Sequence, residues 1–350
     1  MRLRFANAAE VAHWDELVEA APGGGEVWQS KEYAAAKAFQ NYAPRYVVGE
    51  PGDGFPATLV LEKRVPLLGR LWYVPAGPAG RDTAEVLAHS TALGQLAREN
   101  GAFVLKVEPR LLRSDEAKAA FTGAGFQPTF RILPNASTIL LDISGEEAEV
   151  MGRFSSSTRT KIRKADKIGF TVERVEATEE NCRTMYALLS ETGDEKFQLR
   201  PYEYYKTFWQ TFSATGRGQL VLGSTESGVV CGMFGIVLGN TSCYKDGASS
   251  KAGLPNGAMN RMQWELVLWA REHGATVHDL CGAPPSEQID DKEHALYGVG
   301  QYKLRFNKEV TDYVGTFDLP LKGAAYALWT KVGDRLARRL SLAKRKDPYY

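Results

Sequence analysis

The feature that most constrains this 350-residue chain is a helical pattern that ends at a glycine and leads directly into an apolar strand, once in each half. Asn100-Gly101-Ala102-Phe103 marks the junction in the first half, and His273-Gly274-Ala275-Thr276 marks it in the second. Glycine ends helices because it adopts the left-handed backbone of a C-cap without steric cost. The recurrence predicts a duplicated domain with a joint near residues 142–150.

Strand and helix patterns alternate around both junctions, which predicts a mixed α/β fold. Hydrophobic residues make up 44% and charged residues 24%, so the whole chain is expected to fold. The expected strands are 45–48, 58–63, 71–74, 103–107, 170–172, 219–224, 229–237, 241–246 and 276–280. The expected helices are 8–20, one from about 30, 84–100, 151–167, 182–193, 202–211, 256–273 and 324–346.

The formal net charge of +1 hides two basic segments. Six basic residues and one acid lie between Arg153 and Lys167, and seven basic residues and one acid lie between Lys331 and Lys346. Such segments bind RNA, pyrophosphate or the anionic face of a membrane by Coulomb attraction, although a merely solvated helix face is the alternative. The second segment is also amphipathic, with an apolar stripe at Ala325, Leu328, Val332, Leu336 and Leu340.

The sequence offers little support for a metal site or for covalent catalysis. His273 and His278 have no cysteine or carboxylate at ligand spacing, and we expect ordinary core or surface histidines. Motifs for a P-loop, a nucleophile elbow or a dinucleotide fingerprint are missing. The four cysteines, which lack CxxC spacing, are Cys182, Cys231, Cys243 and Cys281. We expect these cysteines to be buried apolar residues, and their spacing indicates a protein of the reducing cytoplasm. No cofactor is expected.

An aromatic cluster follows Arg200. Tyr205, Phe208 and Trp209 would form the buried stripe of a helix, while Arg200 and Tyr204 lie four residues apart and project elsewhere. A guanidinium and a phenol placed in this way can bind phosphate or carboxylate.

Several segments, in order along the chain, together resemble the FemABX family of aminoacyl-tRNA-dependent peptidyltransferases. They include a Gln-Ser segment that ends at Lys37, an Ile-Arg-Lys-Ala run at 162–165, Arg-x-x-x-Tyr-Tyr at 200–205 and Tyr-x-x-Gly-Ala-Ser at 244–249. The segments are 28–37, 154–169, 186–205, 243–249, 256–269, 279–282, 300–306 and 313–315. The long helical arm of some members is missing, which makes the chain similar to the FemX type.

This resemblance implies an α/β fold with two GNAT-like domains in tandem. Domain 1 would span residues 1–147, with a C-terminal helix at 320–346 packing back on it, and domain 2 would span 148–319. The implied reaction moves glycine, alanine or serine from aminoacyl-tRNA to the side-chain amine of residue 3 of a peptidoglycan stem peptide. The acceptor would be lipid II or UDP-MurNAc-pentapeptide, and the enzyme a cytoplasmic monomer that can touch the inner face of the membrane.

The resemblance also assigns candidate residues. Lys303 and Tyr302 would lie near the aminoacyl ester. Apart from the resemblance, Glu108, at the end of the first central strand, and Asp279 are candidates for a general base, with a structural role as the alternative for Asp279. The residues implied to hold the diphosphate and muramyl part of the acceptor are Lys37, Arg200, Tyr204 and Tyr244. The residues implied to contact tRNA are Arg159, Lys161, Arg163 and Lys164.

Two alternatives stay open at this level. A CoA-dependent N-acyltransferase on the same fold would need a glycine-rich pyrophosphate loop before a helix, for which Asn256-Gly257-Ala258 is a poor substitute. A non-catalytic RNA-binding or membrane-binding module would explain the two basic segments but not the candidate acceptor residues.

Overall fold

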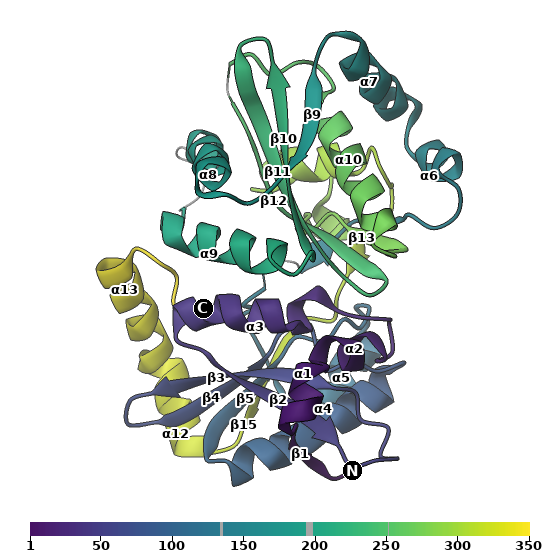
Figure 1. Cartoon of the computed structure of the whole chain (residues 1–350). Helices are drawn as coiled ribbons and strands as arrows, with labels where there is room; N and C mark the ends of the chain where they lie inside the picture. The colour runs from purple at the N-terminus through teal and green to yellow at the C-terminus, as the bar shows by residue number, and fades with distance from the viewer. Residues whose placement is uncertain (134–135, 194–198, 251) are drawn as a thin grey trace. The chain divides into compact units, whose positions relative to one another are not determined.

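The computed structural model describes residues 1–133, 136–193, 199–250 and 252–350, so part of the family-like segment 186–205 lies outside the described residues. Two compact units divide the chain (Figure 1): Met1–Ala136 together with Asp312–Tyr350, and Ser137–Thr311. The chain crosses from one unit to the other at the short strands β7 (Ser137–Thr138) and β14 (Thr311–Asp312). Both crossings precede the predicted limits at 147 and 319.

The first unit is built on a seven-stranded sheet in the order β1-β2-β3-β4-β5-β15-β6. Every pairing is antiparallel except that of β4 with β5. The strands are β1 (Leu3–Phe5), β2 (Ala43–Gly49), β3 (Thr58–Val65), β4 (Gly69–Val74), β5 (Ala102–Val107), β6 (Gln127–Thr129) and β15 (Thr316–Pro320). Since β15 lies between β5 and β6, it belongs to this sheet although its sequence position follows the second unit.

Helices surround this first sheet. The core includes the fully buried side chains of Trp72, Leu93, Leu105 and Phe121. The helices are α1 (Ala8–Ala12), α2 (Trp14–Glu19), α3 (Lys31–Lys37), α4 (Thr83–Glu99), α5 (Asp115–Gly123), α12 (Gly323–Leu328) and α13 (Asp334–Arg345). A turn of π-helix, Trp329–Gly333, joins α12 to α13 within the predicted C-terminal helix.

The second unit contains a six-stranded sheet in the order β8-β13-β12-β11-β10-β9. Only the pairing of β12 with β13 is parallel. The strands are β8 (Leu140–Asp142), β9 (Thr171–Val175), β10 (Gly218–Thr225), β11 (Gly228–Leu238), β12 (Thr241–Ser249) and β13 (Val277–Asp279).

Figure 1 shows α8 and α9 on one face of this second sheet and α10 on the other. The predicted apolar stripe is confirmed, because Tyr205, Phe208 and Trp209 are buried where α9 packs on the sheet. The helices are α6 (Glu147–Arg153), α7 (Ser156–Lys167), α8 (Glu179–Gly193), α9 (Tyr202–Ser213), α10 (Ala258–Glu272) and α11 (Tyr297–Lys303).

The predicted duplication corresponds to a crossover that occurs in both units. Helix α4 connects the parallel neighbours β4 and β5, and α10 connects the parallel neighbours β12 and β13. Gly101 and Gly274 follow these helices with φ of 76° and 85°, a backbone conformation that a residue with a side chain rarely adopts. The mixed α/β fold class predicted from the sequence is confirmed.

Candidate functional site

A buried lysine lies beside the carboxyl end of β13 in the second unit. Lys303, the last residue of α11, is 5% exposed, and its Nζ donates hydrogen bonds of 2.8 Å to the carbonyl oxygens of both Cys281 and Gly282. Burial lowers the pKa of Lys303 below that of an ordinary lysine, because removal from water disfavours the charged form.

Asp279 holds the loop that supplies these carbonyl groups. Its Oδ1 accepts a hydrogen bond from the hydroxyl of Thr138 and another, of 2.6 Å, from the backbone N–H of Cys281. Cys281 has a φ of 57°, which is uncommon for a residue other than glycine. The carboxylate therefore stabilises the unusual turn that directs two carbonyl groups toward Lys303.

Two tyrosines accompany the lysine. Nζ of Lys303 lies 5.9 Å from the ring centroid of Tyr244 on β12, and the Tyr302 hydroxyl donates to the carbonyl of Met259 at 2.9 Å. Burial raises the pKa of both phenols, so both are neutral at physiological pH. The structure thus brings together Lys303, Tyr302, Tyr244 and Asp279, four of the residues that the sequence singled out.

Two of the four cysteines lie next to this loop. The sulfur atoms of Cys243 and Cys281 are 2.7 Å apart; Cys243 is buried and Cys281 is half-buried. Cys182 and Cys231 are buried elsewhere in the second unit, and burial raises the pKa of the Cys231 thiol to about 12. The burial of Cys182, Cys231 and Cys243 agrees with the prediction that the cysteines are apolar core residues, whereas Cys281 is only partly buried.

Arg200 and Tyr204 lie at the start of α9, on the face of the second sheet that α9 covers. Arg200 precedes the helix and Tyr204 lies in its first turn. The guanidinium carbon of Arg200 lies 4.5 Å from the ring centroid of Tyr204, which is 8% exposed. This contact orients the guanidinium by a cation–π interaction. It does not come from a shared helix face, because Arg200 precedes the first residue of α9, and Tyr204 does not project away from the apolar stripe but is buried against Tyr205 and Phe208.

The sequence analysis missed an ion pair on this face, between Lys245 and Asp246. Lys245 donates to Asp246 at 2.8 Å and lies 4.8 Å from the Phe208 ring, while Trp209 Nε1 donates to Asp246 at 2.9 Å. Consecutive strand residues normally point to opposite faces, but the pairing of β11 with β12 shifts by one residue here. This bulge lets both charged side chains face α9. The sequence feature that could have revealed this ion pair is the Lys-Asp dipeptide within an expected strand.

Lys37 lies in the first unit, at the end of α3. It is 5% exposed; its Nζ donates to Gln40 Oε1 at 2.7 Å and lies 5.5 Å and 5.8 Å from the ring centroids of Tyr33 and Tyr42. Lys37 is therefore not an ordinary solvated helix lysine, because its ammonium lies close to two aromatic rings.

Glu108 follows β5 in the first unit and accepts hydrogen bonds from several donors. The Tyr73 hydroxyl donates at 2.6 Å and the Thr316 hydroxyl at 3.3 Å, and the backbone N–H groups of Ile132 and Leu133 also donate to the carboxylate. The carboxylate is 7% exposed. This arrangement ties four segments of the first unit together.

The basic helix α7 divides its cations between two roles. Thr158, Ile162 and Ala165 form its buried seam, whereas Arg163 and Lys164 are exposed and Lys161 is half-buried. Arg159 instead donates to the carbonyl groups of Gly152 and Phe154 at the end of α6.

Gly257 belongs to the segment Asn256-Gly257-Ala258, which was compared with a pyrophosphate-binding loop. In the structure this glycine is needed for packing. Its φ is 96°, and a side chain there would collide with the carbonyl group of Lys161 on α7.

His278 is fully buried between Ser242 and Gln263, with ring nitrogens 2.7 Å and 2.8 Å from their side chains, and burial lowers its pKa to about 3. Among the described residues, no three His, Cys, Asp or Glu side chains gather as metal ligands.

The FemAB family model matches residues 117–228 and 223–333, and the chain belongs to the FemAB family. Lipid II:glycine glycyltransferase of Staphylococcus epidermidis RP62A is 25% identical, with 95% of this chain and 96% of the relative covered. The enzyme of the same name from Staphylococcus aureus USA300 is 23% identical with the same coverage. The crystal structure of FemX superimposes with a TM-score of 0.79, at 22% identity, over 94% of this chain and 99% of FemX. The expected family and the tandem GNAT-like fold are therefore confirmed.

Proposed function

We propose that this chain transfers an aminoacyl group, glycine, alanine or serine, from aminoacyl-tRNA to the side-chain amine of residue 3 in the stem peptide of lipid II. The single observation that carries the proposal is the nearly full-length alignment with lipid II:glycine glycyltransferases of two staphylococci. Glycine is the first donor to test, because it appears in the names of both relatives. UDP-MurNAc-pentapeptide is the alternative acceptor.

The reaction is an aminolysis. The lone pair of the neutral acceptor amine attacks the ester carbonyl carbon, and a tetrahedral oxyanion forms. The bond from that carbon to the ribose oxygen then breaks, the nitrogen loses a proton and the ribose oxygen gains one, so an amide and a free tRNA terminus result. Because an ester is already activated, holding the amine and the ester together supplies much of the rate.

Lys303 is the proposed oxyanion stabiliser. An ammonium has three donors, and the carbonyl groups of Cys281 and Gly282 use two of them. The third is proposed to point at the oxyanion, in a site where burial strengthens the interaction. Tyr244 and Tyr302 would line the same site as neutral phenols. For Asp279 and Glu108 we propose positioning roles in place of proton transfer, because several donors already occupy each carboxylate.

Charged residues outside this site are proposed to bind the two substrates. Arg200 and Tyr204 would hold the acceptor diphosphate. Tyr244, beside Lys303, and Lys37 of the first unit are also proposed acceptor ligands. The proposed tRNA contacts are Arg159, Lys161, Arg163 and Lys164, with the larger effects expected at the exposed Arg163 and Lys164. The enzyme would act as a monomer on the cytoplasmic side of the membrane, where aminoacyl-tRNA is available.

The test is incubation of the purified protein with radiolabelled aminoacyl-tRNAs and either lipid II or UDP-MurNAc-pentapeptide. Label should appear in the acceptor, and RNase treatment of the donor should abolish this transfer. Label that moves only from acyl-CoA would favour an N-acyltransferase on the same fold. Absence of transfer from either donor would contradict an enzymatic role and favour the binding module.

A further inference from the structure

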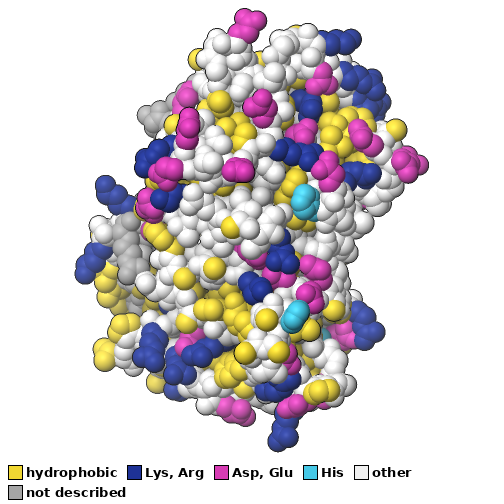
Figure 2. All heavy atoms as spheres, in the orientation of Figure 1, with side chains coloured by type: hydrophobic (Ala, Val, Ile, Leu, Met, Phe, Trp, Pro, Cys, Tyr) yellow, Lys and Arg dark blue, Asp and Glu magenta, His cyan; other side chains and the backbone are white. Residues whose placement is uncertain are grey.

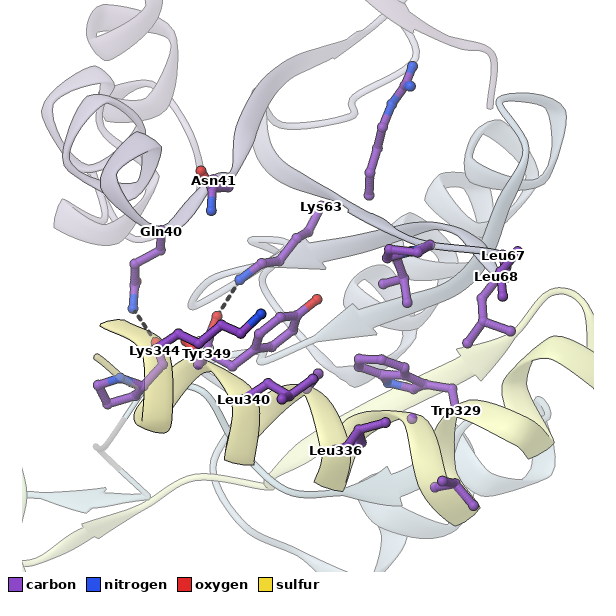
Figure 3. Close-up of a pocket in the computed structure, with 18 of the residues that line it drawn as sticks. Gln40, Asn41, Lys63, Leu67, Leu68, Trp329, Leu336, Leu340, Lys344 and Tyr349 are labelled. Atoms are coloured by element: carbon purple, nitrogen blue, oxygen red, sulfur yellow. Dashed lines mark hydrogen bonds between the residues drawn. The ribbon is translucent and has the colours of Figure 1, made fainter. Parts of the chain in front are cut away.

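An apolar groove runs along the first unit between the β3–β4 hairpin and the C-terminal helices α12 and α13 (Figure 3). Its volume is about 840 Å³. Figure 3 shows Leu336 and Leu340 on α13 and Leu67 and Leu68 on the hairpin among the residues that line the groove, with Trp329 below Leu68. Every residue that lines it belongs to the first unit.

The walls of this groove are exposed to an unusual degree for large apolar side chains. Leu67, at the tip of the hairpin, is fully exposed, and Leu328, Val332, Leu336 and Leu340 are each between 46% and 55% exposed. These four helical residues recur every four positions, so they form one stripe along the helix. A contiguous apolar stripe of this kind marks an interaction surface, since single exposed leucines are common but rows of them are not.

The charges beside the stripe that reach solvent are positive. Both acids of the tail are buried: Asp334, at 6% exposure, accepts from the Tyr350 hydroxyl at 2.5 Å, and Asp347 is 3% exposed. Figure 2 shows Lys and Arg side chains beside hydrophobic ones over α13. The exposed cations of the tail are Lys331, Arg335, Arg338, Arg339, Lys344 and Lys346.

The end of the chain holds this helix in place. Gln40 donates to the carbonyl of Tyr350 at 2.7 Å, and Lys63 donates to the carbonyl of Tyr349 and lies 3.6 Å from the centroid of its ring. The Ser341 hydroxyl donates to the carbonyl of Asp347 at 2.8 Å. The groove therefore has a fixed floor and a fixed helical wall.

We propose that this surface docks onto an anionic phospholipid bilayer. The helical stripe and Leu67 would enter the boundary between headgroups and acyl chains, and the cations would contact lipid phosphates. Charge and polarity together favour this occupant: RNA would satisfy the cations but leave the apolar stripe in water, and a second copy would bring two cationic rims together. The inference rests on the proposed function only in that a lipid-linked acceptor lies in a membrane.

The test is cosedimentation with vesicles of phosphatidylcholine containing 30% phosphatidylglycerol, against vesicles of phosphatidylcholine alone. We expect binding to the anionic vesicles that weakens with salt. Leu336→Ser with Leu340→Ser should weaken binding at least tenfold. The matched control is Leu342→Ser, an exposed leucine of the same helix that does not line the groove, and it should bind within about twofold of wild type.

A second double variant tests the cations beside the stripe. Its two positions are exposed, so the substitutions are not expected to cause misfolding. Arg335→Glu with Arg339→Glu should weaken anionic binding by more than twenty-fold, since each cation near such a surface contributes roughly a factor of five. Urea unfolding of both double variants should match that of wild type.

The proposal would be overturned if wild type did not bind anionic vesicles, or if the leucine double variant bound them as well as wild type does. Binding of labelled tRNA through Arg335 and Arg339 without vesicle binding would also overturn it. So would a dimer that the leucine substitutions dissociate. The proposed function fails separately. If wild type binds vesicles but transfers no label to UDP-MurNAc-pentapeptide or lipid II, the docking surface stands and the proposed reaction does not.

Discussion

The crossovers β4–α4–β5 and β12–α10–β13 each end in a strand with a carboxylate at its carboxyl end. The two carboxylates have different hydrogen-bond partners. At the end of β5, Glu108 accepts from Tyr73, from Thr316 and from two backbone N–H groups, and forms a closed cluster inside the first unit. At the end of β13, Asp279 fixes the left-handed turn at Cys281, whose carbonyl group and the next one hold Lys303.

Equivalent positions of the duplicated fold therefore have different contacts. Both units keep the helix–glycine–strand crossover, and both place a carboxylate at its end. In the first unit the carboxylate joins segments of the fold, whereas in the second it positions a buried ammonium. We therefore propose that the reaction takes place in the second unit and that Glu108 contributes to stability.

The largest effect on this comparison is expected from Glu108→Ala. The substitution leaves the buried Tyr73 hydroxyl and two backbone N–H groups without their acceptor, which should lower the free energy of unfolding by about 3–5 kcal/mol. Urea unfolding measures this loss. Glu116→Ala on the exposed surface of α5 is the control, and it should change stability by less than about 0.5 kcal/mol. Equal stability of wild type and Glu108→Ala would remove the distinction between the two strand ends.

A pH dependence of stability should arise at β13. The folded protein holds His278 with a pKa of about 3, below the 6.5 of an exposed imidazole, so between these values only the unfolded chain gains the proton. Stability from this group is complete above pH 6.5 and is lost as the pH falls, by about 2–3 kcal/mol at pH 4.5. Comparison of His278→Gln with His273→Gln, at an exposed position, isolates the effect. The acid slope should diminish only in the first variant.

An alkaline limb should appear in the transfer rate. Because burial lowers the pKa of Lys303, its ammonium is lost at a lower pH than that of an ordinary lysine, and the rate should fall there. In Lys303→Arg the guanidinium keeps its proton, so this limb should move upward even if the maximal rate is lower. At the pH where wild type keeps a tenth of its maximum, the variant should keep most of its own. Identical limbs would argue against Lys303 as the titrating group.

A smaller effect is expected at the end of the chain. Tyr350→Phe removes the hydroxyl that donates to buried Asp334, which should cost about 1 kcal/mol in the free energy of unfolding. Transfer to UDP-MurNAc-pentapeptide should be unchanged, because Gln40, the partner of Lys37, donates to the carbonyl of Tyr350, which the substitution keeps. A large loss of transfer with normal stability would show that the first unit contributes directly to the chemistry.

Local patterns in the sequence predicted much of the fold. Glycine conformation and helical periodicity are local properties, so Gly101, Gly274 and the buried stripe of α9 were all predicted. The short strands β1, β6, β8 and β15 were not, because each contains only three to five residues and depends on a neighbour distant in sequence.

The site was predicted only in outline. Lys303 and Asp279 came from the family resemblance, but the burial of Lys303 depends on the left-handed turn at Cys281, which no local pattern indicates. Lys245 and Asp246 were missed because only a bulge in the pairing with β11 places both on one face. The environment of Lys37 likewise depends on Gln40, which contacts the end of the chain.

The most direct test of the central claim compares Lys303→Met with Glu108→Gln in single-turnover transfer from glycyl-tRNA, alongside urea unfolding of each. We predict that Lys303→Met slows transfer by a factor of about 100 or more while the protein stays folded, since one oxyanion donor contributes about that much. Glu108→Gln should be less stable but transfer within about threefold of wild type, as should Lys308→Met at an exposed lysine. The reverse pattern, with transfer lost in Glu108→Gln and retained in Lys303→Met, would contradict the account.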